Sequence, residues 1–140
     1  MSYSIYIIQE DSSVSASGIR KRGTVKGAIK IGVAKSVEDR VATLQTGNPR
    51  EIVIRAIIPG IPRKKQALDL EGRLHEFFKK RRLNGEWFGK GILHTAVSIA
   101  HAYAKSGLFN TPCREVMRDS QKLNKFVRRH VSAQEAEAAL

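Results

Sequence analysis

The sequence contains a single cysteine, Cys113, so the chain cannot form a disulfide bond within itself. Its first residues lack a charged segment that leads into an apolar run, and this absence argues against a secretion signal. The most apolar helical stretch, residues 92–104, is shorter than the roughly 20 residues that a membrane-spanning helix needs. We therefore expect an intracellular, cytoplasmic protein with no membrane partner.

Acidic residues are also scarce in this chain. There are 13 Asp and Glu residues against 25 Lys and Arg residues, which gives a formal net charge of +12. A net charge this strongly positive favours a polyanionic partner, chiefly nucleic acid. A structural nucleoprotein would show the same excess of basic residues. The chain of 140 residues is 41% hydrophobic, so it can still bury a core and does not match a disordered chain.

The spacing of the hydrophobic residues and the positions of the turn residues predict an α+β fold. We expect a small three-stranded, mostly antiparallel sheet flanked by helices, in a domain that spans residues 1–108. Residues 109–140 would add a basic C-terminal helix and a tail. The expected strands are residues 3–9, 28–33 and 51–58, and the expected helices are residues 36–45, 64–82, 92–105 and 114–130.

Four polar side chains occupy positions that the pattern assigns to the interior or to one shared face. In the first predicted helix Arg40 borders the apolar stripe, and in the second Glu71 lies within it. Alternation along the first two strands places Tyr6 and Lys30 on the same face, and Gly32 leaves room for a close approach to the backbone. A buried carboxylate is costly unless it is paired, neutralised or bound to a metal.

Residues of these four types can together hydrolyse a phosphodiester. A carboxylate can hold a divalent ion that acts as a Lewis acid, and an arginine can bind phosphate and stabilise charge in the transition state. A phenol or an amine can activate water. The pattern fits a structural alternative equally well, in which Arg40 and Glu71 form an ion pair, Lys30 is solvated and Tyr6 lies at the edge of the core.

Short blocks spread over residues 3–90 carry a resemblance to a known family. The blocks are Ser4-Ile5-Tyr6, Lys30-Ile31-Gly32-Val33, Arg40, Leu44-Gln45-Thr46-Gly47-Asn48-Pro49, Glu71 and Gly85-Glu86-Trp87-Phe88. In this order they resemble the GIY-YIG nuclease superfamily, and especially its phage- and prophage-associated branch. The chain departs from that family in having Ser4 in place of glycine and a longer stretch between Tyr6 and Lys30.

The resemblance implies a role for each of the four residues. Tyr6 would be a general base or orient the attacking water, and Lys30 would assist Tyr6 or help to position that water. Arg40 would contact the scissile phosphate, and Glu71 would bind one Mg²⁺ or Mn²⁺ ion.

Further residues are accessory or substrate-binding candidates. His75, one turn after Glu71, could share its metal or flank the site, and Glu86 and Trp87 fall in the last block. Two basic segments could bind backbone phosphates or could be solvated faces. Their residues are Arg20, Lys21 and Arg22 in the long loop, and Arg114, Arg118, Lys122, Lys125 and Arg129 along the last helix.

The sequence therefore predicts a metal-dependent endonuclease with a single GIY-YIG-type active site. DNA is the expected substrate, although nothing in the sequence distinguishes it from RNA, and the sequence does not indicate the oligomeric state. The alternative is a nucleic-acid-binding module on the same fold that does not cleave.

Overall fold

The computed structural model describes residues 2–11 and 26–106. Its strands are β1 (Tyr3–Asp11), β2 (Lys26–Ala34), β3 (Ile52–Ile61), β4 (Arg82–Asn84) and β5 (Trp87–Phe88). Its helices are α1 (Val37–Thr46), α2 (Lys64–Phe77) and α3 (Leu93–Ser106), with single 3₁₀ turns η1 (Lys79–Arg81) and η2 (Lys90–Ile92). The α+β class predicted from the sequence is confirmed.

The strands form one antiparallel sheet in the order β3-β1-β2-β5-β4. The prediction of three strands is wrong, because β4 and β5 extend the sheet beyond β2. They form a hairpin whose turn contains Gly85, with φ of 55°. Strands of three and two residues are too short for an alternating pattern to reveal them.

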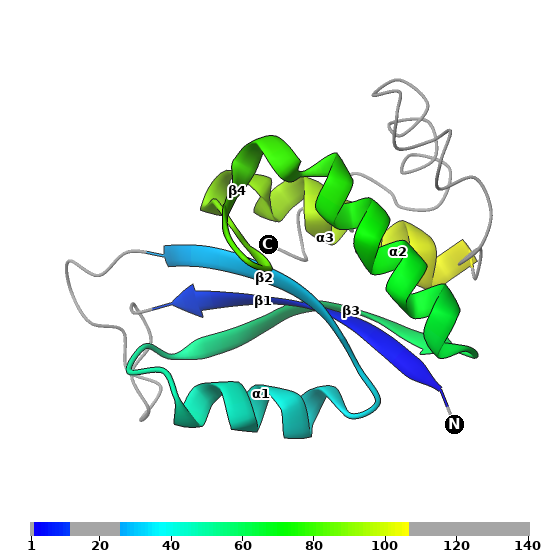
Figure 1. The fold of residues 1–140 in the computed structure, drawn as a ribbon, viewed down its shortest axis with the longest axis horizontal. Coiled ribbons are helices and arrows are strands. Elements are labelled where there is room, and N and C mark those ends of the chain that lie inside the picture. The colour runs from blue at the N-terminus through cyan, green and yellow to red at the C-terminus, as the bar shows by residue number, and fades with distance from the viewer. Residues whose placement is uncertain (1, 12–25, 107–140) are drawn as a thin grey trace.

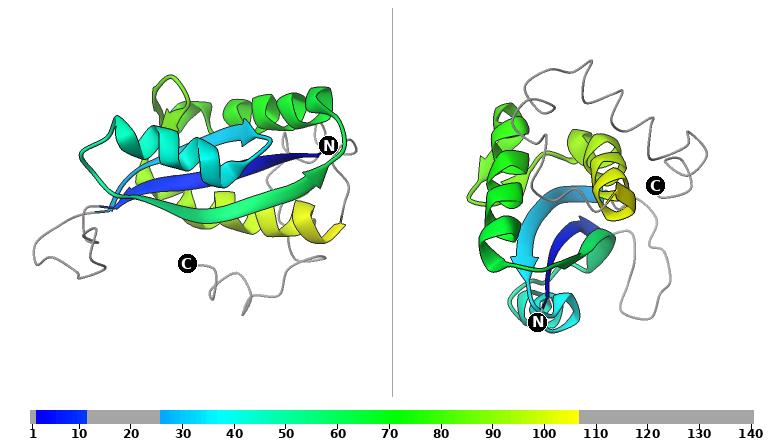
Figure 2. Two further views of the ribbon diagram at one scale, coloured as in Figure 1. Left: turned by 90° about the horizontal axis from the view of Figure 1, so that it is seen from below. Right: turned by 90° about the vertical axis from the view of Figure 1, so that its right-hand side faces the viewer.

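Helices cover both faces of the sheet (Figures 1 and 2). Helices α2 and α3 pack on one face, over a core that includes Ile5, Ile7 and Ile31. Helix α1 packs on the other face, over a smaller cluster that includes Tyr6 and Ile8. The alternation along β1 therefore sends successive residues into two separate cores, as a strand covered on both faces requires.

The boundaries of the long elements follow local chemistry. Helix α1 begins as predicted, because the Ser36 hydroxyl accepts a hydrogen bond from the Asp39 N–H at 3.3 Å. Strand β3 does not end at Pro59 but continues through a bulge, in which Gly60 has φ of 73°. An edge strand tolerates the missing N–H of a proline. Helix α2 ends at Phe77, earlier than predicted, because the chain turns back to start β4.

The loop between α1 and β3 is held by side chains from the Gln45–Pro49 segment. Gln45 donates from Nε2 to the carbonyl oxygens of Asn48 and Arg50, and its Oε1 accepts from the Ile52 N–H at 2.7 Å. Asn48 donates to the Glu10 carboxylate at 3.1 Å. The Gln45–Pro49 segment therefore fixes the start of β3 against α1 and β1.

Several predictions fall outside the described residues. These are the loop residues Arg20, Lys21 and Arg22, the stripe of basic residues between 114 and 129, and the division of the chain at residue 108. No helix in the described part of the chain is long and apolar enough to cross a membrane.

Candidate active site

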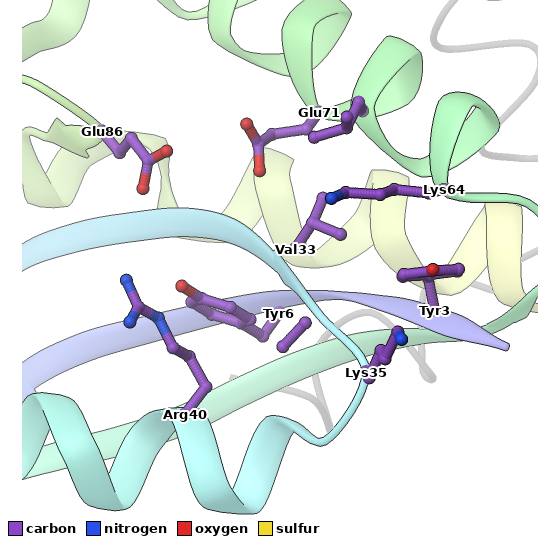
Figure 3. Close-up of a pocket in the computed structure, with 10 residues that line it drawn as sticks. Tyr3, Tyr6, Val33, Lys35, Arg40, Lys64, Glu71 and Glu86 are labelled. Atoms are coloured by element: carbon purple, nitrogen blue, oxygen red, sulfur yellow. The ribbon is translucent and has the colours of Figure 1, made fainter. Parts of the chain in front are cut away.

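A pocket opens at the edge of β2, where the sheet is incomplete. Strand β5 pairs with β2 only at Ile29 and Lys30, so no strand of the described residues lies beside residues 32–34 on that side. Helices α1 and α2 flank this free edge from opposite faces, and the pocket between them has a volume of about 350 Å³. Three of the four predicted catalytic residues, Tyr6, Arg40 and Glu71, line it (Figure 3).

Glu71 reaches the pocket from α2 and is partly buried. Burial raises the pKa of its carboxyl group, and the nearby Glu86 carboxylate raises the pKa further, while His75 and Lys30 act in the opposite direction. Within the described residues Glu71 forms no hydrogen bond or ion pair. The structural alternative, an ion pair with Arg40, is therefore not present.

Tyr6 reaches the pocket from β1, in the layer under α1. It lies opposite Gly32 in the register of β1 and β2, and a Cβ atom at Gly32 would overlap the Tyr6 ring and hydroxyl group. The close approach to the backbone expected at Gly32 is therefore made by the tyrosine itself. The ring is buried, and its hydroxyl group bonds to no other described residue and points into the pocket.

Arg40 lies on the exposed surface of α1, and its guanidinium group points toward the same part of the pocket as the Tyr6 hydroxyl (Figure 3). It has no carboxylate partner in the described part of the chain. A guanidinium group that is not already paired can bind a phosphate through two parallel hydrogen bonds.

Lys30 is not among the residues that line the pocket, and it contacts the two accessory candidates of the last sequence block. Its Nζ atom lies 2.6 Å from the Glu86 carboxylate and 5.7 Å from the centre of the Trp87 ring. The pairing of β2 with β5 places Trp87 opposite Lys30. Lys30 shares a sheet face with Tyr6 as predicted, but its ammonium group contacts Glu86, and it is Glu86 that lines the pocket.

His75 connects α2 to the free edge of β2. Its Nε2 atom lies 2.8 Å from the Ile31 carbonyl oxygen, and its ring packs against Phe88 at 5.2 Å between centres. A carbonyl oxygen only accepts, so Nε2 carries the hydrogen and is not available to a metal. No group of three or more potential metal-ligating side chains occurs among the residues that the structure describes.

Two lysines also line the pocket, and the sequence had not indicated them. They are Lys35, directly after β2, and Lys64, the first residue of α2. The Lys35 ammonium group lies 5.7 Å from the centre of the Tyr3 ring. Exposed lysines at the ends of elements follow no sequence period, so only their position in the folded pocket distinguishes them.

These features define an α+β domain with a pocket that is lined by two carboxylates, an arginine and two lysines. A family model, that of the T5orf172 domain, matches residues 4–105. The chain therefore belongs to the T5orf172 domain family. No curated protein and no solved structure matches the chain.

The assignment to the GIY-YIG superfamily and to its phage-associated branch is wrong. The family model that matches is a different one, and it covers the segment in which the resemblance was found. The resemblance rested on short blocks separated by unmatched sequence, whereas the family model spans this segment as a whole. The positions of Tyr6, Arg40 and Glu71 in one pocket do not depend on that assignment.

Proposed function

We propose that this protein is a metal-dependent endonuclease that hydrolyses phosphodiester bonds in nucleic acid, with DNA as the expected substrate. One observation carries the proposal: Tyr6, Arg40 and Glu71 come from three different elements and meet in one pocket, and none is bonded to another described side chain. Membership of the T5orf172 domain family supports a nucleic-acid-associated, endonuclease-like role. The net charge of +12 favours the same partner.

The acidic end of the pocket fits a hard divalent cation. Glu71 and Glu86 both line it, and the pKa of Glu71 is raised first by burial and then by the Glu86 carboxylate, which a bound cation would counteract. The donor atoms are carboxylate oxygens, and Mg²⁺ is commonly held by one or two carboxylates and several waters rather than by a complete protein cage. Glu71 would hold the ion, which would supply Lewis-acid stabilisation of the scissile phosphate.

Arg40 would bind the scissile phosphate. Its guanidinium group faces the pocket and has no competing carboxylate among the described residues. Such a group can contact two non-bridging oxygens at once and stabilise the charge that develops on them as phosphorus is attacked.

Tyr6 would handle the attacking water. The water oxygen forms a bond to phosphorus while the bond from phosphorus to the leaving sugar oxygen breaks. The proton of the water leaves for solvent through the Tyr6 oxygen, and the leaving oxygen takes a proton from solvent. Lys30 would act through Glu86: their contact at 2.6 Å keeps the Glu86 carboxylate at the pocket wall, so Lys30 is a positioning residue.

The test is a cleavage assay with purified protein. Labelled single-stranded DNA, double-stranded DNA and RNA are each incubated with Mg²⁺, with Mn²⁺ or with EDTA. The proposal predicts cleavage that requires the metal, and the products identify the substrate. Tight binding without cleavage under every metal condition would overturn the proposal in favour of a module that only binds nucleic acid.

A further inference from the structure

The pocket extends beyond the groups that the proposed reaction uses. Glu71, Glu86 and Arg40 surround one end, Lys35 lies beside Tyr3 at the other, and the side chain of Lys64 extends between them with its ammonium group toward Glu71 (Figure 3). The two lysines come from the end of β2 and the start of α2, which the fold brings together at the free edge of the sheet. They therefore belong to the same pocket, and the proposed reaction uses neither of them.

Neither lysine is neutralised within the described residues. Lys35 and Lys64 take part in no ion pair with a described carboxylate, and both are exposed to solvent. Two unpaired cations that line one pocket repel each other, and an anion placed between them removes that repulsion. Arg40 already serves the scissile phosphate, so the lysines point to a second anionic group.

The surroundings of the two lysines suit a nucleotide. The Tyr3 ring lies against Lys35 and restricts the directions in which its ammonium group can point. Leu68, one helical turn after Lys64, lines the same pocket and is 47% exposed, so it offers apolar surface to a sugar or base. Cations beside an aromatic ring and apolar surface are a common setting for single-stranded nucleic acid.

We propose that Lys35 and Lys64 form a subsite for the phosphate that neighbours the scissile phosphate on the same strand. The identity of the ligand rests on the proposed function. The subsite holds the strand along the pocket, from the lysines to the carboxylates of Glu71 and Glu86. It therefore sets where the strand lies relative to Arg40 and Glu71, and it contributes to binding whether or not cleavage follows.

The first test measures binding in EDTA, with a short fluorescent oligonucleotide and fluorescence anisotropy. The double variant K35A/K64A is compared with K65A/K90A, which removes two exposed lysines that do not line the pocket. We expect K35A/K64A to bind about tenfold or more weakly than wild type, whereas K65A/K90A stays within about twofold. Equal affinities for the two double variants would overturn the subsite.

The second test identifies the phosphate. Single phosphates of the oligonucleotide are replaced in turn by neutral methylphosphonates. In wild type, a methylphosphonate at one position next to the cut should weaken binding about tenfold. In K35A/K64A the same replacement should have no further effect. K35R/K64R should restore the response, because it restores both cations. Identical responses of wild type and K35A/K64A at every position would overturn the proposal.

These tests separate the subsite from the reaction. A protein that loses binding in K35A/K64A but never cleaves with any metal retains the phosphate subsite, and the hydrolase proposal fails. A protein that cleaves, and whose binding and cleavage are the same in K35A/K64A and K65A/K90A, retains the hydrolase, and the subsite fails.

Discussion

At the scale of single residues, Glu71 is the group whose surroundings matter most. Its pKa is raised first by burial and then by the Glu86 carboxylate. The folded protein therefore holds a proton on Glu71 more tightly than the unfolded chain does. The stability that this group contributes is complete below its unfolded pKa and is lost as the pH rises through its raised folded pKa.

The variant Glu71→Gln tests the direction in which this stability changes with pH. An amide carries no charge, so without metal we expect the variant to unfold at a higher temperature than wild type near pH 8. The difference should shrink as the pH falls toward about 3, where the wild-type carboxyl is protonated in both states. Thermal unfolding followed by circular dichroism in EDTA measures it. Glu76→Gln, on the exposed side of the same helix, is the control. A variant less stable than wild type at every pH would contradict the raised pKa.

Position 32 has room only for glycine, because the Tyr6 side chain occupies the space that a Cβ atom would need. In Gly32→Ala the added Cβ would overlap the buried Tyr6 ring, so the ring or the strand must move. We expect a loss of about 1–3 kcal/mol in the free energy of unfolding, together with a loss of cleavage because Tyr6 is displaced. Urea denaturation and the cleavage assay measure the two effects.

Gly72→Ala is the matched control, because nothing lies within 4 Å of a Cβ added there. It lies inside α2, so alanine should raise the free energy of unfolding by about 0.5–1 kcal/mol. If Gly32→Ala were as stable and as active as Gly72→Ala, the account of Tyr6 and Gly32 would be wrong.

At the scale of elements, the sequence predicts those parts of the fold whose signal is local. The cap at Ser36 and the apolar stripe of α1 predict that helix almost to the residue. Alternation along β1 and β2 correctly places Tyr6 and Lys30 on one face of the sheet. The third strand was predicted to end at residue 58, but at a sheet edge a bulge lets β3 continue past Pro59.

The candidate site was predictable only where a polar residue interrupts an apolar pattern. Glu71 and Arg40 interrupt or border helical stripes, and both line the pocket. The contact of Lys30 with Glu86 depends on β5 pairing with β2 across 56 residues of sequence, which no local pattern encodes. Lys35 was missed for a different reason, since an exposed lysine after a strand is usually solvated and carries no signal of its own.

Strands β1 and β3 are also joined by a polar cluster whose loss should be costly. Arg55 donates to the Gln9 side chain at 2.8 Å and to the buried Asp11 carboxylate at 2.7 Å. Arg55→Ala removes this partner of a buried charge, and we expect the free energy of unfolding to fall by about 3 kcal/mol. Urea denaturation at neutral pH measures it.

Arg50→Ala is the control for this cluster. Arg50 is 61% exposed in its pair with Glu10, so its removal should cost less than about 1 kcal/mol. Equal losses in the two variants would show that the cluster of Arg55 does not behave as a buried ion pair.

At the scale of the whole molecule, the net charge of +12 predicts a salt-dependent interaction with nucleic acid. Each phosphate contact releases condensed counterions, so the affinity for double-stranded DNA should fall about a hundredfold or more between roughly 50 and 200 mM salt. Anisotropy titrations in EDTA at several salt concentrations measure the slope. An affinity that does not change with salt would contradict electrostatic binding and would favour a partner recognised by apolar contacts.

If the pocket at the edge of β2 cleaves phosphodiesters, Glu71 should be essential to cleavage. The single-turnover cleavage rate of Glu71→Ala in Mg²⁺, compared with that of Glu76→Ala on the same helix, tests this. We expect Glu71→Ala to lose about a thousandfold or more in rate but to keep its affinity for the substrate in EDTA, while Glu76→Ala cleaves like wild type. Cleavage by Glu71→Ala at the wild-type rate, with the same dependence on metal, would contradict this expectation.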